Sequence, residues 1–122
     1  MTDIITSPPG RYNFTIYQGA TFNPTLTWQD GAGNNVNLTG YTGALMARDK
    51  VESEAPFITL TTENGGITLG GAAGTVALYM SAAATAALDR EQGFYDLKLT
   101  SGAGVVTRLV GGAIAIEPQV TR

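Results

Sequence analysis

Short segments in which large apolar side chains alternate with polar ones recur along the chain, separated by turn residues. In the clearest of them, Tyr95, Leu97 and Leu99 alternate with Asp96 and Lys98. A period of two places successive side chains on opposite faces of an extended chain, so that one face can be buried while the other is solvated. This segment therefore predicts a β-strand with one face in a core.

Similar segments, bounded by Gly, Asn, Asp or Pro, follow at intervals of roughly eight to twelve residues, a spacing typical of antiparallel sandwiches and small barrels. Their inward sets are rich in large side chains, which favours two sheets packed face to face. We predict an all-β antiparallel sandwich of seven or eight short strands. The core residues expected from the alternation are Phe14, Ile16, Phe22, Leu26, Trp28, Tyr95, Leu97 and Leu99.

The first residues differ from the rest of the chain. Residues 1–11 contain Pro-Pro-Gly and show no periodicity, and proline disfavours both helices and central strands. We expect a flexible N-terminal arm over 1–11 that crosses a neighbouring subunit, and a sandwich domain over 12–122. Deleting residues 2–10 should then leave the fold intact. The arm residues expected to make the contact are Ile4, Ile5, Pro8 and Pro9.

One segment favours a helix. Residues 81–88 are rich in alanine, which has the highest helix propensity, and Ser81 is suited to the N-cap position. The segment is too short for an independent helix. We predict one short helical turn there.

The last two strands should form a hairpin with an ion pair on its outer face. We place Leu99 opposite Val105, and this register puts Asp96 opposite Arg108. Such a cross-strand pair contributes about 0.2–1 kcal/mol. The glycine pair at 111–112 should form a β-bulge in the second of these strands.

The chain contains no histidine and no cysteine. Their absence excludes imidazole acid–base catalysis, thiolate nucleophiles, disulfides and zinc sites with nitrogen or sulfur ligands. Apart from Asp96, the candidate carboxylates for a catalytic pair fall in predicted loops, with no apolar neighbours to raise a pKa. The glycine-rich segment 65–74 is followed by neither a lysine nor a helix, as a phosphate-binding loop requires. We expect no enzymatic activity, no metal and no cofactor.

The charge pattern also limits the partners. Seven basic and ten acidic residues give a net charge of −3, and the basic residues are scattered singly along the sequence, whereas nucleic-acid binding requires clustered positive charge. No apolar run approaches the length of a membrane span, and the N-terminus does not resemble a secretory signal. We expect neither nucleic-acid binding nor membrane insertion. Because only 14% of residues are charged, the surface suits packing against other subunits.

Several short stretches stand in a distinctive order along the chain. They are residues 17–22, 36–41, 46–48, 93–99 and 107–112, and the ending 114–122. In these stretches the chain resembles small tailed-phage virion proteins, and it is similar to the N-terminal immunoglobulin-like domain of the phage baseplate upper protein. The resemblance covers roughly residues 12 to 122. It implies an immunoglobulin-like β-sandwich that assembles in many copies within a virion and has no catalytic residues.

The resemblance therefore implies a structural protein of the virion, made in the host cytoplasm, that acts in the tail, baseplate or tail–fibre junction. Its expected partners are other phage structural proteins and copies of itself. One alternative keeps the virion but places the protein on the capsid as a decoration, or at the head–tail connector. An alternative of another class is a carbohydrate-binding module for host adsorption, which would depend on an exposed tyrosine.

Overall fold

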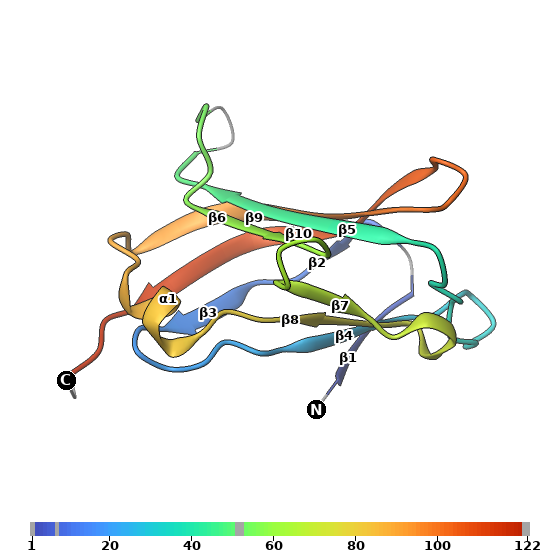
Figure 1. The fold of residues 1–122 in the computed structure, drawn as a ribbon, viewed down its shortest axis with the longest axis horizontal. Helices are drawn as coiled ribbons and strands as arrows, with labels where there is room; N and C mark the ends of the chain where they lie inside the picture. Colours follow the sequence, from blue (N-terminus) through green and yellow to red (C-terminus); the bar gives the residue numbers. More distant parts are fainter. Residues whose placement is uncertain (1, 7, 51–52, 121–122) are drawn as a thin grey trace.

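Two β-sheets pack face to face in the computed structural model, which describes residues 2–6, 8–50 and 53–120 (Figure 1). The smaller sheet has the strand order β1 (Thr2–Ile5), β4 (Thr25–Trp28), β8 (Thr75–Leu78), β7 (Ile67–Leu69). The larger has the order β2 (Gly10–Arg11), β10 (Val106–Glu117), β9 (Gln92–Thr100), β5 (Thr42–Arg48), β6 (Ile58–Thr61), and β3 (Phe14–Tyr17) also pairs with β10. The predicted all-β sandwich is confirmed, with ten strands in the described residues instead of seven or eight.

The strand order is that of an immunoglobulin domain. In that fold, strands A, B, E and D form one sheet and strands G, F and C form the other, which variable-type domains extend with C′. Here β4-β8-β7 corresponds to B-E-D, and β10-β9-β5-β6 corresponds to G-F-C-C′. β1 lies beside β4 in the place of A, but it runs parallel to β4. The chain therefore has an immunoglobulin-like topology.

The sheets are mixed, whereas the sequence predicted antiparallel ones. The pairings of β1 with β4, of β2 with β10 and of β3 with β10 are parallel, and the remaining pairings are antiparallel. All three parallel pairings involve N-terminal strands, which run along the edges of both sheets. The antiparallel prediction holds for the other pairings of the sandwich.

The expected flexible arm is part of this sandwich. In β1, Ile4 pairs with Thr27, and the carbonyl of Ile5 accepts a hydrogen bond from the Gln29 amide at 2.9 Å. Ile5 is buried at 8% exposure and belongs to the core, whereas Ile4 is 55% exposed. The chain then passes to the larger sheet through Pro8-Pro9, which are joined by a cis peptide bond. Strands of four and two residues on either side of two prolines are too short to give a visible period in the sequence, and the prolines lie between the strands.

The core lies between the two sheets. Of the eight residues expected there, the structure buries Phe14, Ile16, Leu26, Tyr95, Leu97 and Leu99, while Phe22 and Trp28 are half-buried and pack against the core. The ring of Phe14 contacts those of Phe22 and Tyr95. Its centroid lies 5.5 Å from that of Phe22, which it meets edge-to-face, and 5.2 Å from that of Tyr95. Fully buried residues outside the expected set of eight include Leu38, Val76, Leu109, Val110 and Ile114.

The β9–β10 hairpin has a different register from the predicted one. Leu99 pairs with Thr107 instead of Val105, because a hydrogen bond between Ser101 and Val105 closes a three-residue loop. Gly104 in this loop has a φ of +88°, the left-handed conformation that such loops require. The bulge lies between Arg108 and Val110, so that Leu109 and Val110 are both buried. The glycine pair 111–112 instead stays in register with β9.

The predicted helical turn is α1 (Ala82–Ala86), which lies at one end of the sandwich (Figure 1). The Ser81 hydroxyl accepts a hydrogen bond from the Ala84 amide at 3.1 Å, as an N-cap does. Thr85 is fully buried, and its hydroxyl donates to the Ala20 carbonyl at 2.9 Å. This bond fixes α1 to the turn between β3 and β4. A separate 3-10 turn spans Gly71–Ala73.

Candidate functional site

A shallow groove of about 750 Å³ crosses the outer face of the larger sheet, the face that points away from the smaller sheet. It extends over β2, β10, β9 and β5. Its floor is low because small residues line it on β5 and on β10, the two strands on either side of β9, and larger apolar side chains also line it. The small residues are Ala44, Gly111, Gly112 and Ala113, and the larger ones are Met46 and Phe94, which are 39% and 49% exposed.

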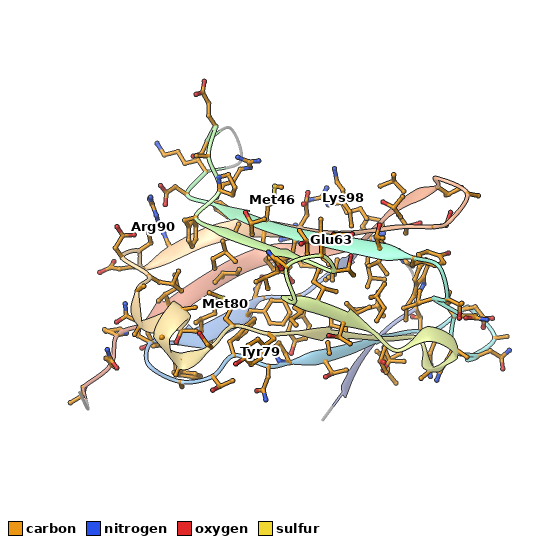
Figure 2. All side chains as sticks on the ribbon, viewed as in Figure 1. Met46, Glu63, Tyr79, Met80, Arg90 and Lys98 are labelled. Carbon is orange, nitrogen blue, oxygen red and sulfur yellow. The ribbon has the colours of Figure 1, made fainter. Side chains whose placement is uncertain are left out.

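The strand register brings distant basic residues together in this groove. Lys98 is opposite Ala44 on one side and Arg108 on the other. In the next row, Asp96 is opposite Gly111, which in turn pairs with Arg11 on β2. The groove is thus lined by four of the seven basic residues of the chain, Arg11, Arg48, Lys98 and Arg108. Asp96 is the one carboxylate that lines it among the described residues. Figure 2 shows Met46 and Lys98 on the outer side of the sheet.

The sequence did not reveal this cluster because its members are far apart along the chain. They belong to four different strands or strand ends, and only the sheet order places them on one face. The one available signal was the outward position of Lys98 and Asp96 in the alternating segment. The basic residues are therefore scattered along the sequence but gathered on this surface.

The expected ion pair of the hairpin is present, but in a different geometry. Arg108 Nε lies 3.7 Å from Asp96 Oδ2. The two residues are diagonal neighbours, since Arg108 is directly opposite Lys98 and Asp96 is directly opposite Gly111. Both side chains are more than one third exposed, and surface pairs of this kind contribute only about 0–1 kcal/mol.

Lys98 and Arg108 form a like-charged cross-strand pair, which destabilises a sheet. Replacing Lys98 with glutamate puts opposite charges across the two strands and is expected to raise the free energy of unfolding by about 0.2–1 kcal/mol. Urea unfolding of the two proteins at low salt measures the difference. Lys98→Gln, which removes the repulsion without adding an attraction, should give an intermediate value. A less stable Lys98→Glu protein would contradict this pairing.

Arg48 closes one end of the groove and is held by the loop that follows β5. Its Nη1 donates to the carbonyls of Ser53 at 3.0 Å and Glu54 at 2.7 Å. These acceptors are uncharged, and Arg48 forms no ion pair with any side chain in the described part of the chain. Lys98 and Arg11 form no ion pair with any residue that the structure describes.

Beneath the groove, Tyr95 fixes the backbone of the N-terminal segment. Its phenol donates a hydrogen bond to the carbonyl of Tyr12 at 2.5 Å. Burial raises the pKa of Tyr95, and the nearby Tyr12 raises it further, so the phenol remains a neutral donor. The Tyr12 amide donates to the Gly111 carbonyl at 3.0 Å. These bonds connect the floor of the groove to the core.

The other residues singled out from the sequence are not brought together. Pro9 lines the groove, Ile4 lies exposed on the edge strand β1, and Ile5 is in the core. Two exposed tyrosines remain as sugar-stacking candidates: Tyr17 on the larger sheet and Tyr79 directly after β8 of the smaller one. Within the described ranges, no group of His, Cys, Asp or Glu side chains could hold a metal ion, and no helix has the length and apolarity to cross a membrane.

Comparison with known proteins gives a structural relationship and no sequence relationship. No protein-family model matches the chain, and no curated protein matches it. Among solved structures, the N-terminal domain of phage TP901-1 ORF48 is similar with a TM-score of 0.58 and 12% identity, over 96% of this chain and 99% of that domain.

Two further solved structures have lower TM-scores. A chicken T-cell receptor has a TM-score of 0.48 at 12% identity, over 91% of this chain and 56% of that chain. A chimeric titin Z1Z2 functionalized with a decorin peptide has a TM-score of 0.43 at 12% identity, over 91% and 92% of the two chains. The chain therefore has an immunoglobulin-like β-sandwich fold, and its fold resembles that of a phage protein domain over nearly its whole length.

Proposed function

We propose that this chain is a non-enzymatic structural module of a tailed-phage virion, in the tail, baseplate or tail–fibre junction, where it contacts other phage structural proteins and copies of itself. The observation that carries the proposal is the fold shared with the N-terminal domain of phage TP901-1 ORF48 over nearly the full length of both. An immunoglobulin-like fold hosts many functions, so the surface of this chain must supply the rest of the argument.

The chemistry of the groove supports binding over catalysis. Hydrolysis of a glycoside by paired carboxylates needs two of them within about 5–10 Å across the substrate. Asp96 is the one carboxylate among the described residues that line the groove, and it already lies beside Arg108. Positive charges next to the exposed Met46 and Phe94 are typical of a surface that packs on another protein.

Quantitative mass spectrometry of purified phage particles, separated into heads and tails, tests the location. The proposal predicts a fixed number of copies of this chain per tail and none in heads. Recovery in heads alone would instead support the capsid decoration or connector. Absence from both fractions would overturn the virion role.

A glycan array with the purified domain tests the carbohydrate-binding alternative. A structural module should give no saturable signal on any glycan. A saturable signal that Tyr17→Ala or Tyr79→Ala removes would favour the adsorption module and contradict the proposal.

A further inference from the structure

The groove and the rest of the chain carry formal charges of opposite sign. Among the residues that the structure describes, the groove carries four cations and one carboxylate, a formal charge of +3. The other side chains that the structure describes include seven carboxylates and two cations, a formal charge of −5. A net-negative protein thus has one positive face, and that face includes a like-charged pair, Lys98 and Arg108, that folding alone would disfavour.

Part of the negative charge lies at the end of the sandwich where β9 begins and β10 ends; we call this the acidic end, and define it by Asp49, Asp89, Glu91 and Glu117. The Glu91 carbonyl accepts a hydrogen bond from the Ile116 amide at 2.8 Å, which places Glu91 next to Glu117. Arg90 forms ion pairs with Asp49 and Asp89 (Figure 2 shows Arg90 at this end). Neither Glu91 nor Glu117 has an ion-pair partner among the residues the structure describes.

We propose that the groove binds the acidic end of a second copy of the same chain. The contact joins two different surfaces. Unless a two-fold axis makes it reciprocal, it is head-to-tail, and a pair of copies keeps one free groove and one free acidic end between them. Complementary potentials would steer the copies together, and Met46 and Phe94 supply apolar surface to be buried in the contact. This inference deepens the proposed function, on which it rests, because it names one contact by which copies of the module assemble.

The opposite arrangement, two grooves face to face, is disfavoured by charge. It would bring a formal +3 against +3 across one interface, and like charges at an interface are costly. A heterologous contact avoids that repulsion. It also propagates, giving a ring where the rotation between copies closes and a filament where it does not.

Sedimentation velocity of the full chain tests the proposal over protein concentrations of about 10 to 300 µM, at about 20 mM and about 500 mM NaCl. The expected result is a mean mass that rises with protein concentration at low salt and much less at high salt. Lys98→Glu, which reverses one charge of the groove, should weaken the association constant at least about tenfold.

Lys50→Glu is the matched control. It changes the net charge by the same amount, but Lys50 is exposed beside Asp49, next to the acidic end. General charge repulsion would weaken the association of both variants equally, whereas the proposed contact predicts that Lys50→Glu associates as well as wild type or better. Because Lys98→Glu is expected to unfold at a midpoint equal to or above that of wild type, loss of association in that variant cannot be ascribed to misfolding.

Three outcomes overturn the proposal: a wild-type protein that stays monomeric at low salt, equal weakening by the two variants, and a monomeric protein whose groove instead binds a labelled single-stranded oligonucleotide through Lys98. The last outcome would assign the groove to a polyphosphate. None of them affects the mass-spectrometry test of virion incorporation, so this inference and the proposed function can fail separately.

Discussion

Replacing Gly112 with alanine is expected to destabilise the domain by about 3 kcal/mol, because the added methyl group meets backbone that cannot move freely. A Cβ at this position would lie 2.3 Å from the Tyr12 carbonyl oxygen and 2.7 Å from Asn13 Oδ1. That carbonyl accepts the Tyr95 phenol, and Asn13 Oδ1 accepts the Ala113 amide at 2.9 Å. The methyl group must therefore disturb two hydrogen bonds as well as create a steric clash.

Urea unfolding of Gly112→Ala and Gly31→Ala measures the effect against a control. An added Cβ at Gly31 meets nothing within 4 Å, so Gly31→Ala should change the free energy of unfolding by less than about 0.5 kcal/mol. Equal stability of the two variants would show that Tyr12 does not approach Gly112 as closely as described.

Removing residues 2–11 is expected to lower the free energy of unfolding by more than about 3 kcal/mol, since it deletes one strand from each sheet. The truncation removes the buried Ile5 side chain and the hydrogen bond from Gln29 to its carbonyl. It also removes the pairing of β2 with Val110 and Gly111. Thermal or urea unfolding of the truncated protein against the full chain gives the difference.

Two point variants separate the contribution of the buried Ile5 side chain to stability from the effect of shortening the chain. Ile5→Ala should cost about 2–4 kcal/mol, whereas Ile4→Ala, at a 55% exposed neighbour, should cost less than about 0.5 kcal/mol. If the truncated chain were as stable as the full one, residues 2–11 would be an arm, as the sequence alone suggests.

The features that the sequence predicted correctly are those that depend on local periodicity. The alternation around Leu97 placed β9 and its two faces correctly, and the alanine-rich segment after Ser81 does form a short capped helix. The sandwich itself follows from many short alternating segments. These features depend on contacts within a few residues, so the sequence displays them directly.

The predictions that were wrong concern features that depend on pairing between strands far apart in the sequence. β1 and β2 are strands only because β4 and β10 offer edges to pair with, and nothing in residues 1–11 indicates this. The bulge formed where Leu109 and Val110 are both buried, because core packing outweighed the preference for glycine. The sequence did not show the basic groove for the same reason, since Arg11 and Arg108 line one groove only because β2 pairs with β10.

We propose that this domain is an assembly module whose outer sheet face is covered by another subunit in the particle. A high-resolution electron-microscopy reconstruction of intact virions tests it most directly. The account predicts density for the sandwich, repeated by the symmetry of the tail, with the groove around Lys98 and Arg108 covered by a neighbouring chain. A complete reconstruction in which every density is assigned and this domain is absent, or is present with that face open to solvent, would contradict it.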